Sequence, residues 1–379
     1  MKRFLFLLML LCLFSQPARG ESLDSALSST LDSLALTPWE NAWKNLMPQG
    51  GDLKSVLLAM ARGEIHLDGE TLLRHFLETL LSHLTSSAAR CAQLMIPAIF
   101  CGVLQKMKSA FARSALGEYV SAACYLLIAS SVAADLGAQI QLAENAVIRL
   151  SDLMQSLFPL LLTLLAAVGG TAGAAFFQPA VVAACGTMTA LVRHVTLPLA
   201  LAAAVTSVLH HLSPHMQVSK LSALFKSAAT WTLGVSFTVF ISVNALQSLG
   251  AAAADGVSIR TAKYAVDHFV PVVGGMFADT MDTLVGASLL IKNALGVTGL
   301  VILLTMLAGP MLKTLGAAMM YQACAAVLQP AAESRLVRCM ADFSGVMMLL
   351  FVVQLSLGAM FLLLIALVLA AGNLTVMLR

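Results

Sequence analysis

The stretch from Ser344 to Ala371 reads SGVMMLLFVVQLSLGAMFLLLIALVLAA and contains no charged side chain. A helix needs only about 20 apolar residues to cross a bilayer, so this stretch is long enough to span one. Further stretches of similar character precede it, at about 89–105, 117–136, 153–170, 172–192, 194–212, 227–249, 268–290, 293–312 and 314–330.

These stretches predict an all-α, polytopic helical membrane protein. Segment 314–330 is short, and segment 268–290 carries acids and either spans the membrane or dips back out of it. We therefore expect about eight transmembrane helices, within a range of about seven to ten.

The composition agrees with this class. Hydrophobic residues make up 59% of the 379 residues and charged residues 11%, and the mean hydropathy is +0.88. Soluble domains carry about 25% charged residues. The 25 glycines suit closely packed membrane helices better than a barrel. The net charge of +3, without a basic cluster interleaved with aromatic residues, argues against a nucleic-acid partner.

The first residues have the form of a secretory signal peptide. A basic start is followed by an apolar run from Phe4 to Phe14, and small residues precede a predicted cut after Gly20. Residues 1–20 are therefore the predicted signal peptide. Residues 21–88 are a small, acidic, exported N-terminal segment, and residues 89–379 are a multi-span transmembrane domain. Apolar periodicity predicts helices in the exported segment at about 23–36, 52–62 and 69–86.

Three loops predict the orientation of the membrane domain. The loop at 105–113 is basic, and the loop with Lys220 and Lys226 is basic as well. Because basic loops stay on the inner side, both are predicted inside and the N-terminal segment outside. The mixed-charge stretch 137–152 is predicted to be an outer loop.

The most informative polar run extends from Pro271 to Asp282. Pro271, Gly274 and Gly275 predict a break in the helix, and Asp279 and Asp282 share one helix face beyond it. One interpretation is a segment lined for an ion or a polar solute, since charges at membrane depth face a cavity or a partner. The other is an interfacial helix whose acids meet outside water. Candidate partners of the acids are the basic residues of the flanking stretches, Arg260, Lys263 and Lys292.

Two smaller polar or small-residue features have structural interpretations. The run Gly169–Ala175 predicts a tight turn with close helix packing, with a hinge as the alternative. Asn244 and Gln247 predict hydrogen bonds between helices, with a substrate contact as the alternative.

Enzymatic function has no signature in this chain. No Walker-type phosphate loop, HExxH motif or GxSxG elbow occurs, so neither an internal ATPase nor a hydrolase is expected. The cysteines occur singly, without a CxxC pair, and indicate neither disulfides nor a zinc site. We expect no cofactor and no metal.

The run from Arg260 to Arg338 carries a family resemblance. It contains Arg260-Thr261-Ala262-Lys263-Tyr264, Phe269-Val270-Pro271-Val272-Val273-Gly274-Gly275, Asp279, Asp282, Lys292-Asn293, Gly296-Val297-Thr298-Gly299, Pro310, Lys313 and Gln329-Pro330. It resembles the stage III sporulation protein AE family of endospore-forming bacteria. The resemblance extends to the signal peptide, the exported segment, the chain length and the multi-span remainder.

The resemblance implies a subunit of the complex that joins the mother cell to the engulfed forespore. That assembly is similar to specialised secretion systems. The implied partners are ring-forming subunits between the two membranes, a separate ATPase subunit and the lipid bilayer. The implied location is the mother-cell membrane facing the forespore.

The leading hypothesis is a non-enzymatic component of this channel complex, needed for forespore development, that conducts or scaffolds. One alternative is a secondary transporter that uses Asp279 and Asp282 on a helix broken near Pro271. The other is an assembly platform without a pore.

Overall fold

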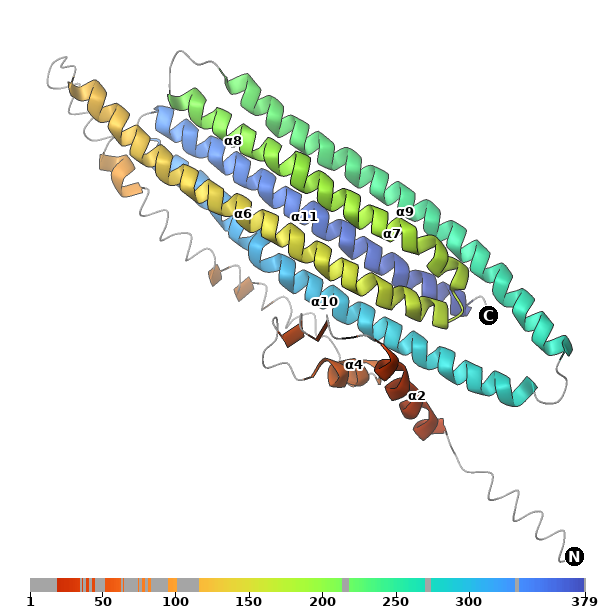
Figure 1. Ribbon diagram of the computed structural model, residues 1–379. Coiled ribbons are helices and arrows are strands. Elements are labelled where there is room, and N and C mark those ends of the chain that lie inside the picture. Colours follow the sequence, from red (N-terminus) through yellow and green to blue (C-terminus); the bar gives the residue numbers. More distant parts are fainter. Residues whose placement is uncertain are drawn as a thin grey trace, which may run out of the picture.

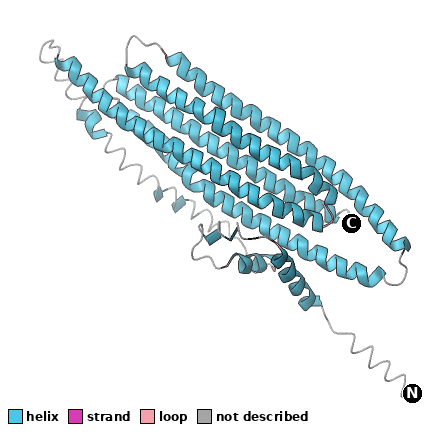
Figure 2. Ribbon diagram, viewed as in Figure 1, coloured by secondary structure: helices cyan, strands magenta, loops and turns pink. Residues whose placement is uncertain are grey.

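Helices make up all the regular structure in the part of the chain that the computed structural model describes. That part covers residues 19–34, 52–62, 95–100, 116–212, 218–269, 274–330 and 334–377, with single residues and pairs between 36 and 82. Five long helical segments form a bundle (Figures 1 and 2). They are α6 (Leu116–Ala167), the continuous run of α7 (Thr171–Leu191), η1 (Val192–Thr196) and α8 (Leu197–Leu212), α9 (Ser219–Phe269), α10 (Gly274–Leu328) and α11 (Ser334–Met377).

The helices run up and down between two ends of the bundle. The starts of α6, α9 and α11 and the ends of α8 and α10 lie together, and we call this the Leu116 end (Figure 1). The α6–α7 turn, the α9–α10 connection and the end of α11 lie at the opposite, Ala167 end. Helix α11 contacts each of α6, α7, α8, α9 and α10, and is therefore the centre of the bundle.

The predicted number of about eight transmembrane helices is not confirmed. Among the described residues, five helices are long and apolar enough to cross a membrane. The stretches predicted at 117–136 and 153–170 are both parts of α6, so the predicted outer loop at 137–152 is wrong. Likewise 293–312 and 314–330 both belong to α10, and 172–192 and 194–212 form one path through the π-helical turn η1. A polar row on one face of a helix interrupts an apolar pattern just as a loop does.

These helices are longer than a bilayer is thick. The 55 residues of α10 span about 80 Å, whereas the hydrocarbon core is about 30 Å thick. Part of α10 must therefore extend beyond the membrane. The part of stretch 268–290 from Gly274 onward belongs to this helix.

The turn between α6 and α7 confirms the tight-turn interpretation of the small-residue run. Gly169 has φ 104°, a conformation that glycine adopts without strain. The amide of Gly170 donates to the carbonyl of Leu165 at 3.0 Å. A Cβ at Gly170 would lie 2.9 Å from Leu165 Cδ1. The chain reverses here within three residues, and the small residues permit it.

The N-terminal helices pack along the side of α10. Helices α2 (Arg19–Ser33) and α4 (Leu53–Ala61) match two of the predicted helices, and both contact α10. Trp39 is 1% exposed, and the Oγ1 atom of Thr298 on α10 donates to Met60 Sδ at 3.3 Å. The signal peptide and the helix predicted at 69–86 lie almost entirely outside the described residues.

One exposed ion pair joins the two N-terminal helices. Lys54 Nζ lies 2.9 Å from Asp32 Oδ1. The hydrogen bond that Lys54 donates to the Asp32 carboxylate, together with the negative charge of Asp32, raises the pKa of the Lys54 ammonium. An exposed pair of this kind adds little stability.

Small residues bring α10 and α11 close together. A Cβ at Gly296 would collide with Leu369, and a Cβ at Gly358 would collide with Leu307. Glycines at such positions let two helix backbones approach closely. On the same helix α10, Cys324 is disulfide-bonded, so the expectation that the cysteines indicate no disulfide is wrong.

Candidate functional site

The predicted segment around Pro271 lies at the Ala167 end of the bundle. Helix α9, which includes Arg260 and Lys263, ends at Phe269, and α10 begins at Gly274. Residues 270–273, including Pro271, lie outside the described residues, and Gly274 and Gly275 are the first two residues of α10. The structure does not describe the side chains of Arg260, Lys263, Asp279 and Asp282, so their pairing stays a prediction.

Lys292, the last of the predicted residues, ties α10 to α11. Its side chain is fully buried. Its Nζ donates to the carbonyl oxygens of Leu369 at 2.9 Å and Val368 at 3.5 Å. A Cβ at position 372 would collide with this Nζ, so Gly372 provides the space for the ammonium group. The described partners of Lys292 are thus main-chain carbonyls of α11.

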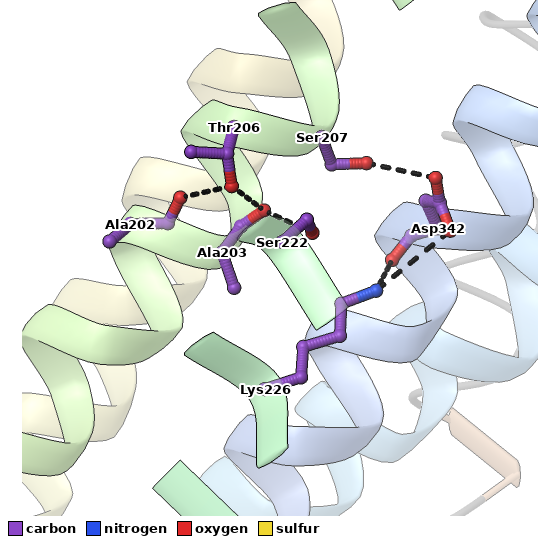
Figure 3. Close-up of polar contacts among 7 residues, drawn as sticks. All are labelled: Ala202, Ala203, Thr206, Ser207, Ser222, Lys226 and Asp342. Atoms are coloured by element: carbon purple, nitrogen blue, oxygen red, sulfur yellow. Dashed lines mark hydrogen bonds and ion pairs between the residues drawn. The ribbon is translucent and has the colours of Figure 1, made fainter. Parts of the chain in front are cut away.

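A charged cluster joins α8, α9 and α11 near the Leu116 end (Figure 3). Lys226 Nζ lies 3.9 Å from Asp342 Oδ1 and donates to the Asp342 main-chain oxygen at 3.2 Å. The hydroxyl of Ser207 on α8 donates to Asp342 Oδ2 at 3.0 Å. Three helices therefore meet at one carboxylate.

Next to this cluster, a hydrogen bond joins α9 directly to α8. The Ser222 hydroxyl donates to the main-chain oxygen of Ala203 at 2.9 Å (Figure 3). This oxygen also accepts from Thr206 at 3.1 Å. The Lys226 and Asp342 side chains are 26% and 44% exposed, so the ion pair lies at the surface of the bundle.

The predictions missed this cluster. Lys226 was assigned to a loop, but α9 begins at Ser219 and Lys226 is in its second turn. Asp342 was not singled out. The signal that could have found them is that each is an isolated charge in a long apolar helix, of opposite sign to the other. Such charges pair inside a membrane bundle.

Other polar side chains fasten α10 to its neighbours. Tyr321 donates to Asp135 Oδ2 on α6 at 2.7 Å, and Gln354 on α11 donates to Thr314 Oγ1 at 3.1 Å. By contrast, Asn244 donates to the Phe240 carbonyl of its own helix at 2.7 Å. The predicted interhelical bond is therefore wrong for Asn244.

We expect that removing the Asp342 carboxylate weakens the packing of α8, α9 and α11 against one another. In a double-mutant cycle of Lys226→Met and Asp342→Leu, the coupling free energy should be roughly 1 kcal/mol, between the values for exposed and buried pairs. The measurement is the free energy of unfolding of the purified protein in detergent, for both single variants and the double variant.

Lys313→Met is the matched control, because Lys313 is an exposed lysine on α10 for which the structure gives no partner. It should change the unfolding free energy by less than about 0.5 kcal/mol. Additive effects of the two cluster substitutions would contradict the assignment of the pair.

The outward face of α9 is apolar over a length that matches a bilayer. Its large exposed side chains are Leu221, Leu224, Trp231, Val235, Val239, Ile241, Val243 and Leu246. From Leu221 to Leu246 the helix rises about 38 Å, slightly more than the hydrocarbon thickness. The exposed hydroxyls of Thr230 and Thr238 donate to carbonyls four residues earlier in the same helix. These two hydroxyls are therefore paired within the helix and do not oppose contact with lipid.

The outward face of α6 has the opposite character. From Ser130 to Thr163 no large apolar side chain is exposed. Exposed polar residues instead follow one another at helical spacing, and we call them the α6 polar row: Gln141, Asn145, Arg149, Asp152, Gln155 and Thr163. The side chains of Gln141, Asn145, Arg149 and Asp152 have no partner within the part of the chain that the structure describes. Beside the row, Glu144 accepts from Arg193 of η1 at 3.0 Å, with both side chains partly exposed.

The α6 polar row lies at the same level as the apolar face of α9. Glu144 contacts Arg193, and Ser222 contacts Ala203. Arg193 lies about 15 Å from Ala203 along η1 and α8, toward the Ala167 end. Helix α9 runs in the opposite direction, so the residue ten positions after Ser222, about 15 Å further along α9, reaches the level of Arg193. Trp231 is therefore nearly level with Glu144. Arg149 and Asp152 follow within about 12 Å along α6.

The exposed polar residues of α6 can bind a partner or line a polar path. The described residues contain no group of three or more His, Cys, Asp or Glu side chains that could hold a metal ion. The chemistry on offer is hydrogen bonding and ion pairing at bilayer depth, on one side of the bundle only. Such a face requires water or another protein beside it, because lipid offers no hydrogen-bond partners.

Two comparisons connect the chain with known proteins. The family model of stage III sporulation protein AE matches residues 51–372. The stage III sporulation protein AE of Bacillus subtilis (strain 168) is 29% identical over 365 residues, which cover 95% of this chain and 92% of that protein. No solved structure matches the chain.

Proposed function

Because the chain belongs to the stage III sporulation protein AE family, we propose that it is a membrane subunit of the complex linking mother cell and forespore. It contributes to forespore development by scaffolding the complex or by conducting through it. Its partners are ring-forming subunits in the intermembrane space and a separate ATPase subunit. The family membership carries a role in sporulation, and the channel complex is our proposal.

The α6 polar row is the observation that carries this proposal. A protein surrounded by lipid on every side would bury these side chains or do without them. An outward polar face at the level of the lipid-facing residues of α9 is what a subunit of a larger membrane assembly needs. A secondary transporter would instead enclose its polar residues between its own helices.

The charges at the two ends of the bundle support the proposed orientation. The Leu116 end carries Lys220 and Arg338 and follows directly on the basic stretch 105–113, which lies outside the described residues. Basic residues favour the inner side. We therefore assign the Leu116 end to the mother-cell cytoplasm and the Ala167 end to the outer side.

The contacts of α2 and α4 agree with an exported N-terminal segment. A Cβ at Gly299 on α10 would lie 3.0 Å from Leu157 Cδ2 and 3.3 Å from Trp39 Cη2. Leu157 lies about 20 Å beyond Glu144 along α6. Since Glu144 is near the middle of the lipid-facing zone, the N-terminal helices attach near its outer edge.

The rise along α10 favours the interpretation of the acidic segment as an interfacial helix over a segment lined for an ion or a polar solute. Asp282 precedes Gly299 on α10 by about 25 Å of helix rise. In the proposed orientation the part of α10 that contains Asp279 and Asp282 thus extends beyond the outer membrane surface. We propose that the tip formed by the end of α9 and the start of α10, which extends beyond the rest of the bundle (Figure 1), contacts the ring-forming subunits. This placement removes the support for a transporter that uses the two acids.

The experiment is to purify the tagged full-length protein from sporulating cells that lack the untagged gene. The ring-forming and ATPase subunits should copurify, and cells without the gene should fail to complete forespore development. Asp279→Asn with Asp282→Asn should lower the recovery of ring-forming subunits by about tenfold, the effect of losing ~1.4 kcal/mol of binding energy. Lys313→Met, which removes an exposed charge on the same helix α10 nearer the Leu116 end, is the matched control and should leave this recovery unchanged.

Two other results of the double substitution bear on the alternatives. Normal recovery with failed sporulation would favour a conducting role for the segment over the contact that we propose. Normal recovery with normal sporulation would exclude any role for these acids. Absence of all complex subunits from the unsubstituted purification would contradict the proposed function itself.

A further inference from the structure

The first question about the α6 polar row is which molecule packs against it. The row occupies one side of the bundle, and the apolar face of α9 belongs to a helix that makes no substantial contact with α6. Arg149 and Asp152 lie one turn apart and carry opposite charges, and neither has an ion-pair partner among the described residues. The two charged residues of the row are therefore unpartnered among the described residues, and their charges balance.

We propose that the α6 polar row packs against the same row of a second copy of this chain, with both copies in the same orientation in the membrane. A two-fold axis along the membrane normal brings identical surfaces together. Each Arg149 then faces the Asp152 of the other copy across a difference in level of about 4.5 Å, which the arginine side chain covers. This inference goes beyond the proposed function because it names the neighbour, and it holds whether the complex conducts or scaffolds.

The charge balance favours a second copy over a different partner. A strongly acidic or basic partner would require a row of one sign, whereas this row presents one arginine, one aspartate and uncharged amides. The amides of Gln141 and Asn145 both donate and accept, so they too can pair with themselves. The charged and amide side chains of the row can therefore find complementary groups in the second copy.

Small residues continue the same face toward the Leu116 end. Ala134, Gly137 and Ala138 are exposed there and fall on the same side of the helix as the row. A Cβ at Gly137 would meet nothing within 4 Å. Small residues allow two membrane helices to approach closely, so the face suits helix packing along its whole length.

Cysteine cross-linking of the purified full-length protein in lipid nanodiscs tests the proposal. Asn145→Cys and Gln141→Cys should each form a disulfide-linked dimer of twice the monomer mass under mild oxidation. The matched control is Val239→Cys, on the lipid-facing side of α9. The dimer yield at the α6 positions should exceed that of Val239→Cys and of the unsubstituted protein by about tenfold.

Charge reversal provides a second, independent measurement. Arg149→Asp should lower the dimer fraction by about tenfold, because two acids then face one another. Arg149→Asp combined with Asp152→Arg restores the complementarity and should restore the dimer. Both positions are exposed, so the variants should fold. Equal cross-linking at α6 and α9, or no effect of charge reversal, would overturn the proposal.

A different neighbour also gives a distinct result. If Asn145→Cys is cross-linked only in cells, to a protein of another mass, and never to itself after purification, a second copy is excluded. If it is cross-linked within its own chain, the row is covered by another segment of the same molecule. Copurification of the other complex subunits is measured separately, so failure here leaves the proposed function untouched.

Discussion

Replacing Trp39 by Ala should release the N-terminal helices from α10. Trp39 is almost fully buried, and its ring lies against Gly299 of α10. Truncation of a buried tryptophan to alanine costs about 3–5 kcal/mol, because contacts are lost and a cavity is left. The indole N–H has no partner among the described residues, so the loss is one of packing rather than of a hydrogen bond.

Limited proteolysis in nanodiscs measures this release. Trypsin sites at Lys44, Lys54 and Arg62 lie within or beside the N-terminal helices. If opening is fast relative to cleavage, ~3 kcal/mol raises the cleavage rate on the order of 100-fold. The control is Trp231→Ala, because Trp231 on α9 is 72% exposed. Its effect should be small. Equal cleavage of both variants would show that Trp39 does not hold the segment in place.

Replacing Gly358 by Leu should separate α10 from α11. A Cβ at Gly358 already collides with Leu307, and a leucine adds three further carbon atoms. Overpacking of a close-packed core costs about 1–3 kcal/mol, and sometimes more. Because α11 contacts all the other long helices, this separation should disturb the whole bundle. Gly296→Leu, against Leu369 in the same seam, should act in the same direction.

Gly286→Leu is the control that distinguishes disruption of the α10–α11 contact from a general effect of a leucine on α10. Gly286 also lies on α10, but a Cβ there would meet nothing within 4 Å. The measurement is the unfolding midpoint in detergent, together with the fraction of monodisperse protein after size-exclusion chromatography. Gly358→Leu should lower both, whereas Gly286→Leu should match the unsubstituted protein. A similar loss in both variants would argue against a close seam.

Several elements were predictable because they depend on local sequence. The small residues at Gly169 predicted the turn between α6 and α7. The periodicity of the N-terminal segment predicted α2 and α4. The motifs between Arg260 and Arg338 indicated the family, which the comparison over residues 51–372 confirms.

The number of helices was not predictable in the same way. The residues at 137–152 are polar enough for a loop, yet they lie within α6. Their polar side chains recur about every three to four residues, so they occupy one face while Val147 and Leu150 are buried on the other. Hydropathy averaged over a window loses this distinction.

The sequence alone determined the class of the protein, a helical membrane protein, together with its breaks and its family. Those features follow from the free energy of each residue in lipid and from backbone preferences, and neither requires a neighbour. The tertiary structure decided which polar residues find partners. Lys226 meets Asp342 across more than a hundred positions, and Lys292 meets α11 carbonyls. Arg149 and Asp152 meet no described partner, because the packing of the bundle leaves that face of α6 outward. A partner is a property of packing, which brings distant positions together, and no local pattern contains it.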